Sequence, residues 1–321
     1  MNKPIDINSE SFSGLKYTSK LVYSPELLLK VEDCSFYDTF SSTGGGAIYF
    51  EYSSATFSCY RSGFYHCRSS KNTLSAGAIY VHIGQYILFN SLCFSNCSAN
   101  DDVTNFQIAN QNNIISYVAV NLSTEENSGK NEYTSMYASH IGGRVSTLCN
   151  YHNVTNSVTV GSEAGIVFTR ASNTVVRFMT LNNNKGSAIV RIFSSCSSPI
   201  SIYNTNICNN TITGSWFIFV SSSTNVVLTE CIFLYNYNRI IQGSGGTILF
   251  NNCLFDTDVS ASLVSKTGVI AYNADVNNLN AIPYFSTRNC WNLGQIPSLY
   301  VPKSNMRSCI IYVLGNMLSF A

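Results

Sequence analysis

Charged side chains are scarce in this chain of 321 residues, where Asp, Glu, Lys and Arg together make up 11%. Ordinary globular domains carry about 25%. The 18 basic and 17 acidic residues leave a net charge of only +1. A chain without a basic surplus has no electrostatic field that would gather nucleic acid or an anionic membrane. We therefore do not expect nucleic acid as a partner.

Long apolar runs are also missing. The longest, residues 309–321, has 13 residues, whereas a membrane-spanning helix needs about 20. We expect this run to form a cap over the end of the core, and a truncated membrane anchor is the alternative. The first 20 residues contain no apolar stretch of the kind found in secretory signals. From these two segments we expect neither a signal peptide nor a complete transmembrane segment.

Metal-binding patterns are absent as well. The 12 Cys are spread along the chain without a Cys-x-x-Cys pair, and the 4 His show no spacing typical of zinc ligands. We interpret the Cys chiefly as small buried hydrophobic residues, because free Cys packs in that way. Disulfides between adjacent layers are the alternative. The sequence therefore predicts no metal site and no cofactor.

The chain is rich in Asn, Ser and Thr, and it contains 20 Gly. Asn and Gly tolerate the left-handed backbone that tight turns require. Hydrophobic residues reach 45% and aromatic residues 13%, so the chain can form a core, unlike disordered chains. Because stretches of helix-favouring residues are short, the composition predicts an all-β fold.

Short apolar strands recur at regular intervals. Residues 46–50 (GAIYF) and 77–81 (GAIYV) are nearly identical and lie 31 positions apart. In the second half one degenerate motif recurs. Its equivalent residues lie at intervals of 26, 25 and 22 positions and are Leu181, Ile207, Ile232 and Leu254. Short strands of this kind, three to a repeat and separated by polar turns, are typical of a parallel β-solenoid.

Other repeat and β architectures fit less well. Ankyrin, tetratricopeptide and HEAT repeats are helical, and a β-sandwich would show hairpin turns such as Asn-Gly or Asp-Gly, which are absent. We predict a right-handed parallel β-helix of about 11 coils of 22–30 residues. Residues 1–30 are expected to form an N-terminal cap and residues 31–260 the coils, with a loop insertion near 121–132. Residues 261–321 would then form the last irregular coils and a C-terminal cap.

Two tetrapeptides and one further motif carry a family resemblance. Residues 45–48 (GGAI), 76–79 (AGAI) and 233–236 (FLYN) resemble polymorphic outer membrane protein repeats. Those repeats belong to the right-handed parallel β-helix, or pectin-lyase-like, superfamily. The chain is also similar to Asn-rich β-helix surface proteins of parasitic protists. The resemblance implies an adhesin at the cell surface or secreted, with a carbohydrate or a host or cell-surface protein as ligand.

Some β-helix proteins are polysaccharide lyases or glycoside hydrolases, so these are the alternative function. Hydrolases of this kind need two carboxyl groups at a defined separation. The only adjacent pair of Asp is Asp101 and Asp102. Asp256 and Asp258 could offer oxygens to Ca²⁺, but one pair cannot supply the six to eight ligands that this ion takes. We interpret both pairs as parts of solvated turns. No catalytic residue is predicted, and a non-catalytic binding protein is the leading hypothesis.

Two groups of residues are candidates for binding a ligand. Tyr49 and Tyr80 belong to a Tyr-rich first third, and outward-facing Tyr rings form good surfaces for sugars or proteins. Arg170, Arg177 and Arg191 fall at similar places in successive repeats, and on one face they would bind an acidic glycan. The alternatives are packing in the core for the Tyr and ordinary solvation for the Arg.

Overall fold

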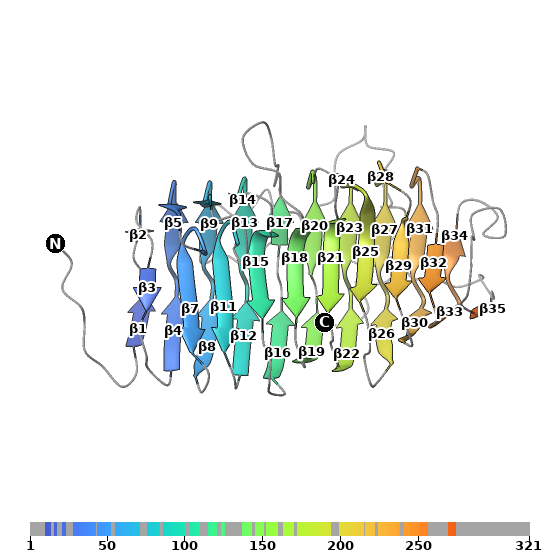
Figure 1. Ribbon diagram of the computed structural model, residues 1–321, viewed down its shortest axis with the longest axis horizontal. Helices are drawn as coiled ribbons and strands as arrows, with labels where there is room; N and C mark the ends of the chain where they lie inside the picture. Colours follow the sequence, from blue (N-terminus) through green and yellow to red (C-terminus); the bar gives the residue numbers. More distant parts are fainter. Residues whose placement is uncertain are drawn as a thin grey trace, which may run out of the picture.

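The computed structural model describes the chain in segments. They are residues 10–13, 16–17, 21–23, 28–42, 44–52, 55–70, 76–83, 86–99, 103–109, 115–120, 123–125, 137–142, 145–150, 152–159, 163–169, 172–193, 199–214, 216–221, 224–237, 241–244, 246–255 and 269–273. Within these segments the regular structure is entirely β. All pairs of neighbouring strands are parallel, and the strands stack side by side along the long axis of the molecule (Figure 1). The predicted all-β parallel solenoid is therefore confirmed.

Three long sheets form the walls of the solenoid. Sheet A contains, in spatial order, β1 (Glu10–Ser13), β4 (Leu28–Glu32), β8 (Thr56–Tyr60), β12 (Tyr86–Asn90), β16 (Ile115–Val120), β19 (Val145–Asn150), β22 (Ser172–Arg177), β26 (Ile200–Tyr203), β30 (Asn225–Thr229), β33 (Thr247–Asn251) and β35 (Val269–Asn273). Sheet B contains β2 (Lys16–Tyr17), β5 (Ser35–Tyr37), β9 (Gly63–Tyr65), β13 (Cys93–Ser95), β17 (Ser123–Glu125), β20 (Asn153–Thr155), β23 (Thr180–Asn182), β27 (Asn206–Cys208), β31 (Ile232–Leu234) and β34 (Leu254–Phe255).

Sheet C contains β3 (Leu21–Tyr23), β7 (Ile48–Tyr52), β11 (Ile79–Ile83), β15 (Val103–Ala109), β18 (Tyr137–Gly142), β21 (Glu163–Thr169), β25 (Ala188–Phe193), β29 (Ile218–Ser221) and β32 (Ile241–Ser244). Two short sheets follow sheet B in some coils. They are formed by β6 (Phe40–Ser41), β10 (Arg68–Ser69) and β14 (Ser98–Ala99), and by β24 (Lys185–Gly186) and β28 (Thr211–Ile212). Each coil thus passes from sheet A through sheet B to sheet C.

The register of the sheets tests the repeat that the sequence predicts. Tyr49 pairs with Tyr80, as the two GAIY blocks require. Leu181 pairs with Ile207, but Ile207 pairs with Phe233 and not with Ile232. The predicted alignment is therefore wrong by one residue at that step, because two adjacent apolar residues offer two possible anchors. The right-handed sense, the number of coils and the limits of caps and insertion stay predictions. Within the predicted insertion, residues 123–125 form β17, and the others lie outside the described residues.

Single residues in the left-handed conformation turn the chain at both ends of sheet B. Asp33, with φ of 54°, marks the first corner and Asp38, with φ of 52°, the second. Each of these residues donates its N–H to the following coil, Asp33 to Tyr60 O at 3.1 Å and Asp38 to Tyr65 O at 3.0 Å. Asn and Asp tolerate this conformation best. Asn adopts it at positions 96, 156, 183, 204, 209 and 252. The abundance of Asn thus has a direct structural use.

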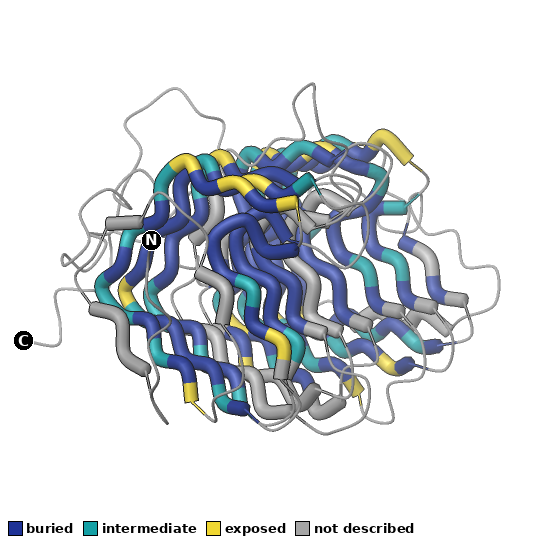
Figure 2. Tube along the Cα trace, turned by 60° about the vertical axis from the view of Figure 1, so that its left-hand side comes forward, coloured by how far each residue is buried: buried dark blue, intermediate teal, exposed yellow. Residues whose placement is uncertain are grey.

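Like side chains stack inside the solenoid. The rings of Phe36, Phe64 and Phe94 stack in successive coils, with centroids 4.9 and 5.1 Å apart. Buried residues recur at the same places from coil to coil (Figure 2). The described free thiols are all buried, as the sequence predicts, at positions 34, 59, 67, 97, 149, 231 and 253. Cys93 and Cys208 each take part in a disulfide.

A ladder of buried amides lines the second corner. Asn184, Asn210 and Asn236 each donate a side-chain N–H to a carbonyl of the preceding coil, at 2.7 to 2.9 Å. Their side-chain oxygens accept backbone N–H groups, as when Asn236 Oδ1 accepts the N–H of Asn210 at 3.1 Å. Because each amide satisfies a donor and an acceptor that burial would otherwise leave unpaired, the ladder holds the coils in register.

Candidate functional site

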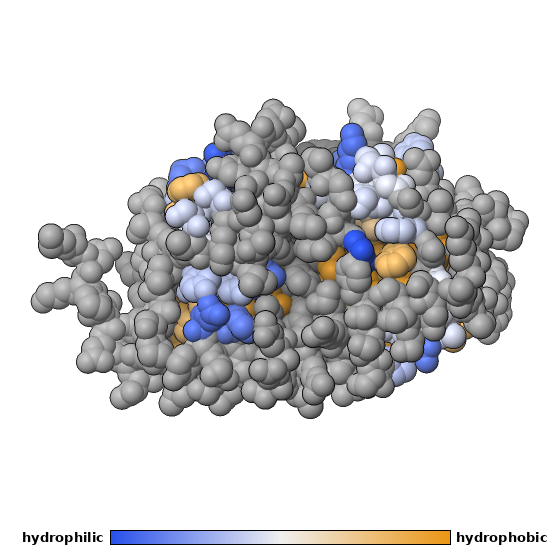
Figure 3. Space-filling view, in the orientation of Figure 1, coloured by the Kyte–Doolittle hydropathy of each residue, from blue (hydrophilic) through white to orange (hydrophobic). Residues whose placement is uncertain are grey.

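A polar cluster lies on the outer side of sheet C, on β7 and β11. Tyr49 and Glu51 come from β7, and Tyr80 and His82 from the paired positions of β11. Alternate residues of a strand point to opposite sides, and Ile48 and its equivalents are buried in the core. The four side chains therefore share the outward side. A hydrophilic patch is visible over β7 and β11 (Figure 3).

Glu51 is the centre of this cluster. Tyr49 donates its hydroxyl to Glu51 Oε2, and Nδ1 of His82 lies 3.2 Å from Glu51 Oε1. Burial, together with the hydrogen bond to Glu51, raises the pKa of the Tyr49 phenol to about 12. The side chains of Glu51 and His82 are 49% and 27% exposed. A carboxylate, an imidazole and a phenol are thus held together at the surface.

The two Tyr rings differ in exposure. They stack with centroids 5.2 Å apart, but Tyr80 is only 3% exposed and packs against Ala76. The backbone at Gly44 lies directly on Tyr49, since a Cβ added to Gly44 would meet Tyr49 Cδ2 at 2.4 Å. Gly44 also has φ of +128°, which favours glycine. Tyr80 is therefore the buried member of the cluster and packs against the ring of Tyr49. Tyr49, Glu51 and His82 form the accessible part of the cluster.

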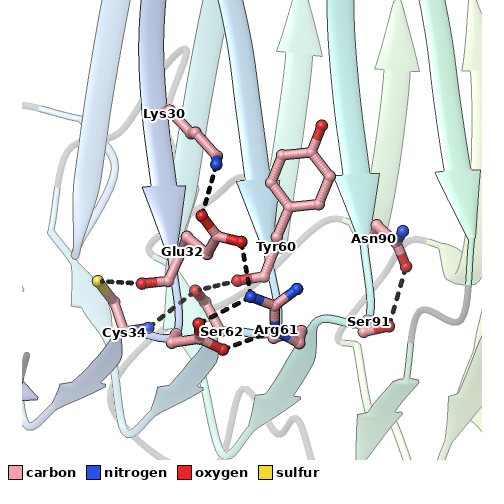
Figure 4. Close-up of polar contacts among 9 residues, drawn as sticks. Lys30, Glu32, Cys34, Tyr60, Arg61, Ser62, Asn90 and Ser91 are labelled. Carbon is pink, nitrogen blue, oxygen red and sulfur yellow. Dashed lines mark hydrogen bonds and ion pairs between the residues drawn. The ribbon is translucent and has the colours of Figure 1, made fainter. Parts of the chain in front are cut away.

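A second polar cluster lies at the first corner, beside sheet A (Figure 4). The guanidinium of Arg61 binds Asp33 through two hydrogen bonds of 2.7 and 2.8 Å, and Glu32 at 2.6 Å. Lys30 forms a further ion pair with Glu32. Hydrogen bonds from Lys30 and Arg61 lower the pKa of Glu32, and the hydrogen bond from Arg61 lowers the pKa of Asp33. Both carboxyl groups are therefore ionised and neutralised by cations.

Ser62 supports this corner from inside. Its hydroxyl donates to Tyr60 O at 2.7 Å and accepts the N–H of Cys34 at 3.1 Å. In Ser62→Ala the buried N–H of Cys34 loses its partner, whereas Tyr60 O keeps the N–H of Asp33. We therefore expect the free energy of unfolding to fall by about 1–2 kcal/mol. Urea denaturation measures this, with Ser42→Ala at an exposed position as the control. Equal stability of the two variants would contradict the role of Ser62.

The predicted Arg candidates do not share a face. Arg177 ends β22 in sheet A and lies 5.7 Å from the centre of the Tyr203 ring. Arg191 lies in β25 of sheet C, 5.4 Å from the Phe219 ring. The expectation of one Arg-lined face is therefore wrong for these two residues. Arg170 lies outside the described residues.

The candidate acids of the sequence are not placed, since Asp101, Asp102, Asp256 and Asp258 also lie outside the described residues. Conversely, sequence reasoning missed Glu51 and His82. Each follows its Tyr by two positions, in the paired blocks that begin at Gly46 and Gly77. The repeat therefore contained the signal, because residues two apart on a strand face the same side.

Neither a metal site nor a related protein adds to the candidate site. Among the residues that the structure describes, no three His, Cys, Asp or Glu are grouped so that they could hold a metal ion. The same residues contain no helix that is long and apolar enough to cross a membrane. No protein-family model matches the chain, and a search of curated proteins finds no match. Membership of the pectin-lyase-like superfamily therefore stays a prediction.

Proposed function

We propose that this chain is a non-catalytic, surface-type binding protein, similar to β-helix adhesins, which presents the outer side of sheet C to a glycan. The observation that carries the proposal is the exposed cluster of Tyr49, Glu51 and His82 on a sheet with fixed register. Grouped donors and acceptors that are already oriented suit a ligand rich in hydroxyl groups. Because Glu51 is the only acid in the cluster and would repel carboxylates, the glycan is neutral.

The state of the carboxyl groups favours binding over hydrolysis, which is the alternative. A glycosidase needs a general acid whose pKa is raised. Ion pairs lower the pKa of Glu32 and Asp33 instead. The raised pKa of Tyr49 also keeps its phenol protonated near neutral pH, so that almost no phenolate is present to act as a base. These directions of the pKa shifts support a protein that binds its ligand without cleaving it.

The test is incubation of the full chain with insoluble cellulose, chitin and xylan at neutral pH. Protein that sediments with the polymer is quantified, and soluble oligosaccharide is assayed in the same tubes. We expect retention without release. Glu51→Gln removes the charge at the centre of the cluster, and charge-assisted hydrogen bonds contribute about 1.5–3 kcal/mol. Retention of this variant should be weaker by about tenfold or more.

Glu230→Gln is the matched control, since Glu230 is an exposed acid at a first-corner turn and accepts a hydrogen bond from Asn204 at 2.7 Å. Its retention should equal that of the wild type. Release of oligosaccharide, with or without calcium, would contradict the proposal in favour of a lyase or hydrolase. Absence of retention on every polymer would contradict a glycan ligand, and binding to whole cells would then test for a protein receptor.

A further inference from the structure

Cys231 and Cys253 occupy the same place in two successive coils. Each follows a left-handed turn residue, Glu230 with φ of 55° and Asn252 with φ of 48°. The backbones on either side of the pair are joined by hydrogen bonds of 2.9 Å, from Glu230 N to Asn251 O and from Leu254 N to Cys231 O. The two cysteines are therefore direct neighbours in the stack.

Both thiols lie inside the solenoid, and each donates to a carbonyl of the preceding coil, Cys231 to Ile202 O at 3.7 Å and Cys253 to Leu228 O at 3.4 Å. The two residues are 0% and 1% exposed, and the Sγ of each lies 3.4 Å from a carbonyl two residues before it. Neighbouring parallel strands are separated by about 4.7–4.9 Å. That separation falls within the range of about 4.4–6.8 Å between Cα atoms that disulfides span.

We propose that Cys231 and Cys253 are a thiol–disulfide exchange site, which reacts with low-molecular-mass disulfides such as oxidised glutathione and forms a disulfide between two coils. In the first step the Cys253 thiolate attacks one sulfur of oxidised glutathione and releases a glutathione thiolate. Cys231, which loses its proton, then attacks the Cys253 sulfur and releases a second glutathione thiolate. Two protein thiols are oxidised, one glutathione disulfide is reduced, and the two protein protons end on the two glutathione molecules.

The surroundings assign the attacking role to Cys253. The adjacent Cys231 thiol lowers the pKa of the Cys253 thiol, while burial raises the pKa of Cys231. The thiolate is the nucleophile in exchange. Cys253 also directly precedes β34, where Leu254 and Phe255 are only half-buried. β34 is the last strand of sheet B in the described part of the chain, and opening of this half-buried strand would admit the reagent.

A second stacked pair, Cys67 and Cys97, provides an internal reference. These residues adjoin β9 and β13, which have further strands of sheet B on both sides. Because burial raises the pKa of the Cys97 thiol, this pair should exchange more slowly than Cys231 and Cys253.

The chain allows Cys231 and Cys253 to be followed separately. The reduced protein is exposed to oxidised glutathione, alkylated in denaturant at successive times, and digested with trypsin and a glutamyl endopeptidase. Cleavage after Glu230, Arg239 and Lys266 gives peptides 231–239 and 240–266, each with a single Cys. Peptide 62–68 reports Cys67 alone. We expect peptides 231–239 and 240–266 to become linked while Cys67 is still alkylated.

Cys231→Ser separates the two chemical steps, because serine keeps a donor for the neighbouring carbonyl. In this variant Cys253 should stop at the mixed disulfide with glutathione. The proposal is overturned if both cysteines of the wild type stay alkylated, if Cys253 retains glutathione although Cys231 is present, or if Cys67 is lost as fast as Cys231. The readout is independent of any glycan, so it stands or fails separately from the binding function.

Discussion

Phe64→Ala is expected to lower the free energy of unfolding by about 4 kcal/mol, because removal of a buried aromatic ring leaves a cavity. Phe64 is fully buried at the centre of β9, between the rings of Phe36 and Phe94. The interplanar angles of 2° and 14° show that it stacks on both neighbours. Its removal therefore takes away contacts to two other coils as well as its own hydrophobic burial. Guanidinium denaturation followed by circular dichroism measures the change.

Phe40→Ala is the matched control on the same side of the solenoid. Phe40 lies in the short strand β6 and is 57% exposed. Surface replacements of this kind usually change stability by no more than about 0.5 kcal/mol. If Phe64→Ala were as stable as Phe40→Ala, the continuous Phe stack would not contribute to the stability of the solenoid.

The Phe stack also shows why the fold could be predicted from the sequence. In a parallel solenoid each coil places equivalent residues over one another, so the interval between motifs is the length of a coil. Phe64 and Phe94 are 30 positions apart and pair in the register of β9 and β13. Where two apolar residues were adjacent, as at Ile232 and Phe233, the interval alone could not choose between them. A slip of one residue exchanges the two sides of a strand, so geometry was needed there.

The candidate site was only partly predictable. The Tyr-rich first third predicts Tyr49 and Tyr80 as binding candidates, and the structure pairs them in the register of β7 and β11. The burial of Tyr80 depends on packing by segments outside its own strand, such as Ala76, and no local pattern reports it. Arg177 and Arg191 could have been separated from the sequence alone. They are 14 residues apart, whereas paired positions of β22 and β26 are 26 apart, as for Val175 and Ser201.

Acidification is expected to destabilise the protein through His152, which is fully buried beside Cys149 and Phe106. Its Nδ1 lies 3.6 Å from the Cys149 thiol, and Nε2 has no hydrogen-bond partner among the described residues. Burial lowers the pKa of His152 from 6.5 to about 4. Below pH 6.5 the unfolded chain therefore binds a proton that the folded chain does not. The free energy of unfolding should fall as the pH is lowered from about 6.5 to about 4, by up to about 3 kcal/mol.

The contribution of His152 is isolated by His152→Met, since Met179 occupies the equivalent place in the next coil and methionine does not titrate. The backbone confirms the equivalence: Thr180 N donates to His152 O as Asn206 N donates to Met179 O, at 3.0 and 2.9 Å. Stability is measured by urea denaturation between pH 7.5 and pH 4, a range set around the two pKa values. The variant should gain stability relative to the wild type as the pH falls, whereas His66→Gln, at the exposed pair with Asp38, should not reproduce this gain. A constant difference between His152→Met and the wild type at every pH would show that His152 is protonated equally in the folded and unfolded chain, and that its environment is not apolar.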